Sequence, residues 1–182
     1  MMTTAKPSIV YYVAASLDGF IATPDGGVDW LSSFGTSADD GGYQEFYSTV
    51  DALLMGSRTY EQILGFGAWP YPDKPCWVFS HRDLPVPHSG VRLTRGTPLE
   101  VACELQTQGI RRAWLVGGGQ LAAAFRSQRL ITDYIITVFP VLLGGGLPMF
   151  GAAGAQERLR LLSSRPLSNG TIQLSYESTP QA

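Results

Sequence analysis

Residues 51–64, DALLMGSRTYEQIL, join an apolar run to a helix-like one through a single glycine. The first part is typical of a buried strand, and the second part is typical of a helix that follows it. Gly56 permits a sharp turn and a close approach by a ligand. The hydroxyls of Ser57 and Thr59 can cap the first helical amides, and Arg58 adds a cation. Because helix N-terminal amides and a cation attract anions, this turn is a candidate anion site; an ordinary capped turn is the alternative interpretation.

Segments with strand and helix character alternate on both sides of this stretch. Such alternation is typical of an α/β domain with a mainly parallel central sheet. Asn169-Gly170, between two strand-like runs, predicts an antiparallel hairpin at one edge of that sheet. We therefore expect one domain over residues 1–182. The strand-like segments are residues 8–16, 51–56, 75–82, 90–96, 111–119 and 133–143, the helix-like segments are 42–50, 57–64, 98–109 and 120–130, and the hairpin is 159–177.

Composition and charge exclude several classes of partner. The net charge of the 182 residues is -2, and no apolar run is long enough to span a membrane, so we expect neither a nucleic-acid nor a membrane partner. The N-terminus lacks the layout of a signal peptide. Cys76 and Cys103 lie in apolar surroundings without metal-ligand spacing, so we expect two buried free thiols and no metal site. These features favour a cytoplasmic protein.

A second glycine-rich turn lies in WLVGGGQLAAAF, residues 114–125. Its three consecutive glycines let the backbone approach a pyrophosphate at the N-terminus of the next helix. Gly117, Gly119 and Ala122 also satisfy the dinucleotide-binding spacing. No carboxylate ends the following strand, however, so a Rossmann dehydrogenase is disfavoured. A glycine-rich turn selected only for tight packing is the alternative.

A third polar turn, VFSHRDLP (residues 78–85), places a hydroxyl, an imidazole and a guanidinium at the end of a strand. Together Ser80, His81 and Arg82 could hold a phosphate monoester, and an arginine at such a position favours NADP over NAD. Alternatively, Arg82 and Asp83 simply pair with each other at the surface. Because ligands bind beyond the carboxyl ends of parallel strands, we expect all three turns to meet at that edge of the sheet.

The order of these motifs resembles that of the dihydrofolate reductase superfamily, and in particular the reductase domain of the bifunctional riboflavin-biosynthesis deaminase–reductase. Five motifs follow the family's order over nearly the whole chain: VAASLDGFIA, LLMGSRTYE, VFSHRDLP, LVGGGQL and DYIITVFPVLLGGGLPMF. The resemblance implies a three-layer α/β fold with a mixed eight-stranded sheet, NADPH as hydride donor, and a homodimer. The apolar segment TVFPVLLGGGLPMF suits either a dimer face or a core strand.

The resemblance also assigns cofactor-binding residues. The turn at residue 56 matches the family's phosphate-binding turn, although serine and not arginine follows its glycine. The turn at residue 80 matches the loop around the adenosine ribose phosphate. The triple-glycine turn matches the loop beneath the pyrophosphate, where the family has an unusual Gly-Gly peptide. The first strand matches the one that packs along the nicotinamide, and TPDGGVDWL resembles a mobile loop over the hydride-transfer site. The assigned residues are Ala14, Ala15, Ile21, Gly56, Ser57, Arg58, Thr59, Ser80, His81, Arg82, Val116, Gly117, Gly118, Gly119, Gln120 and Leu121.

The proton donor is less clearly marked than the cofactor site. In dihydrofolate reductases a buried carboxylate on the first helix holds the pterin and assists protonation. Here Asp40 or Asp39 falls near that position, with Glu45 as a weaker option. A solvated helix cap is the alternative for the two aspartates. Thr137 matches a strand position that faces the substrate pocket in the superfamily, and an ordinary β-branched strand residue is its alternative.

These resemblances predict an NADPH-dependent reductase that transfers a hydride to a C=N or C=O bond of a pterin or pyrimidine riboside. A 5-amino-6-(5-phosphoribosylamino)uracil reductase is the type in the riboflavin branch. The zinc-deaminase signature of the bifunctional enzymes is absent from the sequence, and no cations are clearly dedicated to a phosphoribosyl group. A true dihydrofolate reductase and a non-catalytic NADPH-binding protein stay open as alternatives.

Overall fold

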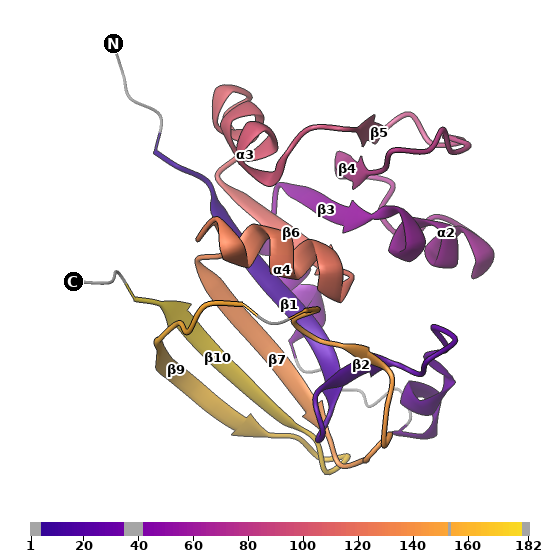
Figure 1. Ribbon diagram of the computed structural model, residues 1–182, viewed down its shortest axis with the longest axis vertical. Helices are drawn as coiled ribbons and strands as arrows, with labels where there is room; N and C mark the ends of the chain where they lie inside the picture. Colours follow the sequence, from indigo (N-terminus) through magenta and orange to yellow (C-terminus); the bar gives the residue numbers. More distant parts are fainter. Residues whose placement is uncertain (1–4, 35–41, 153, 180–182) are drawn as a thin grey trace.

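A computed structural model of the chain describes residues 5–34, 42–152 and 154–179. Within these residues an eight-stranded mixed sheet forms the centre of the molecule (Figure 1). The six strands from β5 to β7 are parallel, β10 is antiparallel to β7, and β9 is antiparallel to β10. The predicted sheet and C-terminal hairpin are therefore confirmed. In spatial order the strands are β5 (Val91–Thr94), β4 (Cys76–Phe79), β3 (Ala52–Gly56), β6 (Arg112–Gly117), β1 (Ser8–Ser16), β7 (Asp133–Phe139), β10 (Ile172–Ser178) and β9 (Leu159–Pro166).

Helices cover both faces of this sheet. One hydrophobic core lies beneath α3 and α4, and a second lies beneath α1 and α2 on the other face. Figure 1 shows α4 crossing in front of β1 and β6. None of the helices formed by the described residues is long and apolar enough to cross a membrane. The helices are α1 (Tyr43–Thr49), α2 (Ser57–Gly65), α3 (Pro98–Thr107) and α4 (Gly119–Ser127).

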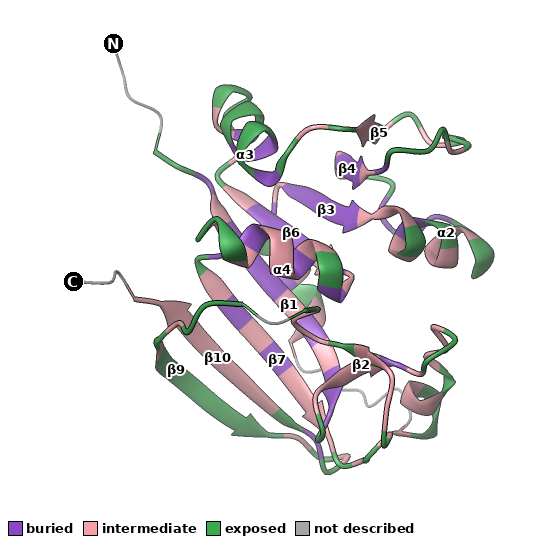
Figure 2. Ribbon diagram, viewed as in Figure 1, coloured by how far each residue is buried: buried purple, intermediate pink, exposed green. Residues whose placement is uncertain are grey.

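Strand β3 shows why the sequence adopts this three-layer arrangement. Its side chains alternate between the two cores: Ala52 and Leu54 face α3 and α4, whereas Leu53 and Met55 face α1 and α2. All four side chains are fully buried, and Figure 2 shows β3 coloured as buried. A strand covered on both faces needs apolar residues at every position, which explains the continuous apolar run.

A small second sheet was not indicated by the sequence patterns. In it, β2 (Phe20–Ala22) pairs antiparallel with β8 (Leu147–Pro148). Such short strands are too brief to show a period of two. Asp18, just before β2, accepts hydrogen bonds from the backbone N–H groups of Leu143 and Gly144 at 3.1 and 2.8 Å. It thereby joins the start of the chain to the segment that follows β7.

Two sequence predictions are wrong in detail. Cys103 is exposed, not buried. Because an α-helix turns about 100° per residue, Val101 and Leu105 face the core while position 103 of α3 faces solvent. Strand β7 ends at Phe139, short of its predicted end, because Pro140 has no N–H group for the ladder.

The ladder between β1 and β6 stops partway along β1. It ends at Tyr11, whereas β1 stays paired with β7 as far as Ser16. Past this point the indole N–H of Trp114 donates to the backbone carbonyl of Tyr12 at 3.0 Å. The last residues of β1, Ala14 among them, therefore lie beside β6 beyond the end of that ladder.

Gly119 begins α4 directly beneath the β8 segment. A methyl group on Gly119 would lie 2.1 Å from the carbonyl oxygen of Pro148, which belongs to the backbone and cannot rotate away. We therefore expect Gly119→Ala to lower the free energy of unfolding by about 1–3 kcal/mol, despite the better helix propensity of alanine. Gly145→Ala is the matched control, because a methyl there meets no described atom within 4 Å. Urea unfolding followed by circular dichroism measures both variants, and equal midpoints would contradict the packing argument.

Candidate active site

Three turns meet at one edge of the sheet. Strands β4, β3 and β6 are neighbours and parallel, so their C-terminal ends lie side by side. The turns that follow them are the three singled out in the sequence. We refer to residues 56–59, 80–82 and 117–121 as the cofactor edge. Their convergence, predicted from the order of strands and helices, is confirmed.

The backbones of the first and third turns are in contact. A Cβ atom placed on Gly56 would lie 3.8 Å from the oxygen of Gly117 and 3.9 Å from the nitrogen of Gly118. One placed on Gly118 would lie 3.5 Å from Thr59 Oγ1 and 4.0 Å from Ile21 Cδ1. The peptide bond between Gly117 and Gly118 is cis. With Leu121 Cβ, 4.0 Å from the same position on Gly56, the structure brings six of the predicted cofactor residues together around Gly56 and Gly118.

Helices α2 and α4 both begin at this edge without side-chain caps. Their N-cap residues are Gly56 and Gly118, which have no side chain to offer. The predicted capping by Ser57 and Thr59 is wrong, because β3 continues to Gly56 and both hydroxyls fall inside the helix. By contrast, α3 begins with a complete capping box at Thr97. Two positive helix ends therefore lie together with amides that no cap satisfies.

Arg82 connects the second turn to the first. Its Nη1 and Nη2 atoms donate to the two carboxylate oxygens of Glu61 on α2, at 3.1 and 2.5 Å. Nη2 also lies 3.4 Å from Ser57 Oγ. Ser80 fixes the turn from within: its hydroxyl donates to the Arg82 carbonyl at 2.8 Å and accepts from the Arg82 N–H at 3.0 Å.

Other charged groups surround this pair. Asp83, the alternative partner predicted for Arg82, instead pairs with Arg95 at 3.0 Å, so that alternative is wrong. Arg58 is exposed on the first turn of α2. The hydrogen bonds from Arg82, and after them the charges of Arg82 and Arg58, hold the pKa of Glu61 below its ordinary value. The carboxylate is therefore the favoured form beside these two cations.

Several predicted cofactor residues contribute packing to this edge. Gly119 is buried beneath β8, and Ala15 belongs to the core under α4. Val116 packs against the other core. His81 and Gln120 are exposed. A direct contact of these five residues with a cofactor stays a prediction.

A row of polar side chains crosses the strands beyond β1. Thr137 of β7 is level with Ala14 of β1 and with Gln173 of β10, and Gln173 Nε2 donates to Thr137 Oγ1 at 3.4 Å. Arg165 of β9 is the cross-strand partner of Gln173, so it lies on the same face. We refer to Thr137, Gln173 and Arg165 as the polar row. It begins beside the end of β1 and runs away from the cofactor edge.

Trp30 is a candidate functional residue in the segment TPDGGVDWL, which resembles a mobile loop, but the sequence patterns did not single out this residue. It lies in the 3-10 helix η1 (Asp29–Phe34), and its ring meets that of Phe139 edge-on at 5.5 Å. Its indole N–H is buried and has no hydrogen-bond partner among the described residues. Because an unpaired buried donor is costly, such a group in a folded protein suggests a missing acceptor. The sequence shows an aromatic residue here but not whether its N–H is paired.

The predicted proton donors are not placed by the structure. Asp39 and Asp40 lie outside the described residues. Glu45 is exposed on α1, whereas its neighbour Phe46 packs into the core, so Glu45 is not a buried carboxylate. Among the residues that the structure describes, no three His, Cys, Asp or Glu side chains gather to hold a metal ion.

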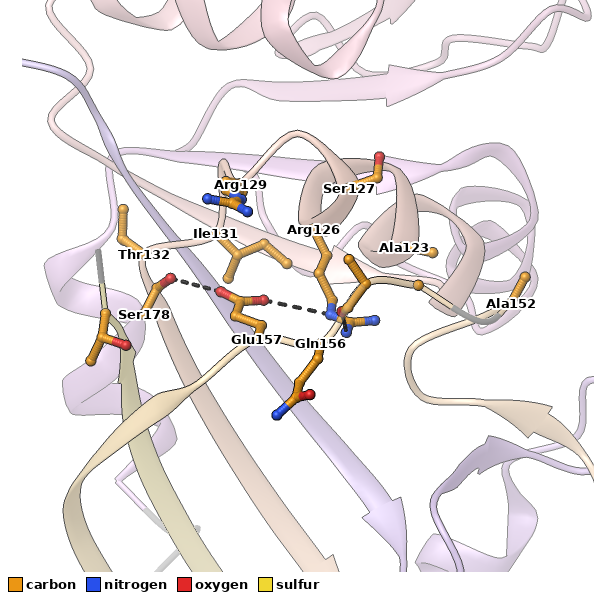
Figure 3. A pocket seen from close by; sticks show the side chains of 13 residues that line it. Ala123, Arg126, Ser127, Arg129, Ile131, Thr132, Ala152, Gln156, Glu157 and Ser178 are labelled. Atoms are coloured by element: carbon orange, nitrogen blue, oxygen red, sulfur yellow. Dashed lines mark hydrogen bonds and ion pairs between the residues drawn. The ribbon is translucent and has the colours of Figure 1, made fainter. Parts of the chain in front are cut away.

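A cavity of about 360 Å³ lies at the opposite end of the sheet, where α4 ends and β7 begins (Figure 3). Its charged groups already have partners. Arg126 Nε lies 3.5 Å from Glu157 Oε2, and Arg126 Nη2 donates to the Ala155 carbonyl. Glu157 also accepts hydrogen bonds from Tyr134 at 3.0 Å and Ser178 at 2.7 Å. Since these groups satisfy one another, we assign them a structural role.

The fold and the glycine-lined edge define an α/β domain of the dihydrofolate reductase type. The family described as the RibD C-terminal domain matches residues 72–173. The uncharacterized protein YwjB of Bacillus subtilis (strain 168) is 35% identical over 168 residues, which cover 92% of this chain and 95% of YwjB. YyaP of the same organism is 26% identical over 180 residues, or 92% of this chain and 93% of YyaP. The chain therefore belongs to the RibD C-terminal domain family.

Solved structures agree with this assignment. A Shewanella sp. PV-4 protein assigned by name to riboflavin biosynthesis has a TM-score of 0.86 and 31% identity, over 95% of this chain and 99% of that chain. The Thermotoga maritima diaminohydroxyphosphoribosylaminopyrimidine deaminase/5-amino-6-(5-phosphoribosylamino)uracil reductase has a TM-score of 0.74 at 15% identity, over 96% of this chain and 57% of that chain. Acinetobacter baumannii RibD has a TM-score of 0.75 at 21% identity, over 98% and 60%. The last two show a shared fold.

The far cavity generates a prediction that separates it from the cofactor edge. Glu157→Ala leaves Arg126, Tyr134 and Ser178 without their shared acceptor, so we expect it to lower the free energy of unfolding by about 2 kcal/mol. Binding of a dinucleotide should not change, because the cavity lies at the other end of the strands. Glu177→Ala is the control, since it removes only a more exposed pair with Arg160. Thermal unfolding and dinucleotide titration test both variants, and a loss of dinucleotide binding in Glu157→Ala would contradict the structural assignment.

Proposed function

We propose that the protein is an NADPH-dependent reductase. The observation that carries this proposal is the meeting of two uncapped helix N-termini, those of α2 and α4, beside Arg82. Such an arrangement attracts phosphate groups, because unsatisfied amides and a guanidinium all donate hydrogen bonds to anions. NADPH presents a pyrophosphate and a separate 2′-phosphate, which matches two helix ends and one arginine.

The residues of the cofactor edge suit the parts of NADPH in order. Gly118 is half-buried and carries no side chain at the start of α4, where the pyrophosphate would lie. Ser57 and Arg82 converge within 3.4 Å and would hold the 2′-phosphate. The nicotinamide would lie along the last residues of β1, including Ala14, beyond the end of the ladder with β6. NADPH, when bound, supplies the hydride.

The polar row and Trp30 would form the substrate side of the site. Thr137 begins the row beside Ala14, so a ring stacked near the nicotinamide would reach its hydroxyl. The indole N–H of Trp30, for which the described part of the chain offers no acceptor, can donate to a carbonyl or ring nitrogen. Arg165, at the far end of the row, supplies a cation for an anionic group of the substrate. Phosphorylated pyrimidine ribosides and pterins with a carboxylate tail both carry such a group.

The protein's part in hydride transfer is to orient the two rings, exclude water and deliver a proton. The aromatic contacts of Trp30 and Phe34 with Phe139 enclose this end of β7 and would keep water from it. We propose that Asp40 or Asp39 delivers the proton, as the resemblance implies.

We also propose a cytoplasmic homodimer. Strand β9 forms an edge of the sheet, and Figure 2 shows it coloured as exposed along its length. Leu161 and Leu162 on this strand expose 53% and 49% of their surface. An open strand edge with apolar side chains favours pairing with another chain, and a second copy would cover it.

Arg82→Ala tests the cofactor assignment. Because charge-assisted hydrogen bonds contribute about 1.5–3 kcal/mol, we expect the variant to weaken NADPH binding about 10- to 100-fold. Binding of NADH, which has no 2′-phosphate, should weaken far less. Arg95→Ala removes an exposed arginine from the same region and serves as the control. Fluorescence titration measures both affinities. Equal losses of affinity for NADPH and NADH would contradict the assignment of Arg82 to the 2′-phosphate.

A substrate panel tests the reaction. We expect the phosphoribosylamino pyrimidinedione or dihydrofolate to be reduced, with loss of NADPH absorbance. Trp30→Phe keeps the ring packing but removes the unpaired donor, so the KM for that substrate should rise about tenfold while NADPH affinity is unchanged. Tight NADPH binding with no oxidation by any substrate would favour the non-catalytic alternative.

A further inference from the structure

We propose that Glu61 is a built-in competitor of the 2′-phosphate, so that this chain binds NADPH less tightly than its arginines alone would permit. The inference rests on the proposed function, and it assigns a selectivity role to a residue that the family resemblance does not mark. The carboxylate lies where its removal would change the choice between NADPH and NADH.

The geometry of Arg82 carries this inference. Its guanidinium uses two nitrogen atoms on Glu61, and one of these is also the atom nearest to Ser57. A phosphate held by Ser57 and Arg82 together would therefore need the nitrogen that Glu61 occupies. Carboxylates and phosphates both accept two parallel hydrogen bonds from an arginine guanidinium, so the two anions compete for the same N–H groups of Arg82.

From its position on α2, the Glu61 carboxylate would also repel the 2′-phosphate directly. Glu61 is three residues after Arg58, so both side chains lie on one face of the helix. The carboxylate thus partly neutralises both arginines of this corner before any cofactor arrives. A phosphate that enters must displace Glu61 from Arg82 and then bind beside a second negative charge.

NADH does not meet this obstacle. Its adenosine ribose carries a 2′-hydroxyl, which can donate a hydrogen bond to a carboxylate, as acidic residues do in NAD-binding sites. Glu61 is therefore expected to oppose one dinucleotide and to tolerate the other. The structure accordingly predicts a measurable affinity for NADH in the natural sequence and a sharper preference for NADPH when the charge is removed.

Glu61→Gln tests this role because glutamine keeps the shape and one acceptor oxygen but loses the charge. We expect the dissociation constant for NADPH to fall about tenfold, which corresponds to about 1.4 kcal/mol, while that for NADH stays within about twofold. Adenosine 2′,5′-bisphosphate should gain as NADPH does, and adenosine 5′-monophosphate should not. Calorimetric titration of the full chain measures all four ligands.

Glu104→Gln is the matched control. Glu104 lies on α3, pairs with Arg92 and has a side chain 44% exposed, against 41% for Glu61. The two variants change the net charge equally, so a gain seen in both would be a general charge effect and would overturn the proposal. An unchanged or weaker affinity of Glu61→Gln for NADPH would also overturn it. Absence of NADPH binding by the natural sequence would instead refute the proposed function on which this inference stands.

Discussion

The proposed site depends on two helix N-termini that lie side by side, each with a partial positive charge. β3 and β6 are adjacent and parallel, and each runs into a helix through glycine, so the N-termini of α2 and α4 face the same region. Their partial positive charges repel each other, and an anion placed between them removes that cost. Gly56 lies against the backbone at Gly117 and Gly118, and none of these three residues has a side chain to fill the space between the turns. The strand order thus supports the proposed anion site.

The sheet separates the two parts of the proposed reductase site. Strands on one side of β1 end in the three turns of the cofactor edge, whereas strands on its other side carry the polar row of Thr137, Gln173 and Arg165. β1 lies between them, and its ladder to β6 ends at Tyr11. A cofactor bound along the end of β1 would therefore lie next to both the turns and the row. Under the proposed function, the donor and the acceptor of the hydride would lie over adjoining strands.

The sequence predicted the elements whose signal is local. β3 is identified by an unbroken apolar run, and the turns by their glycines, because both patterns follow from burial and backbone geometry. The pairing of Arg82 with Glu61 could not be predicted from the sequence, because it depends on β3 and β4 being neighbours in the sheet. The sequence suggested Asp83 as the partner because it is adjacent in the chain. Likewise, the unpaired N–H of Trp30 arises from packing in η1, which no pattern of residue types reports.

The far cavity and the cofactor edge differ in how their polar groups are satisfied, and this difference supports the proposed site at the cofactor edge. Around the cavity, Glu157 accepts from two hydroxyls and faces Arg126, so that each strong polar group has a partner within the chain. At the other end of the strands, two helix N-termini have no side-chain caps, and the indole of Trp30, which packs on Phe139 at the end of β7, has no acceptor among the residues that the structure describes. A buried donor left without an acceptor costs free energy, and a helix N-terminus without a side-chain cap leaves its first amides available to an anion. A ligand that supplies acceptors would satisfy these donors, and a phosphorylated dinucleotide beside a carbonyl-bearing ring would supply acceptors in both places.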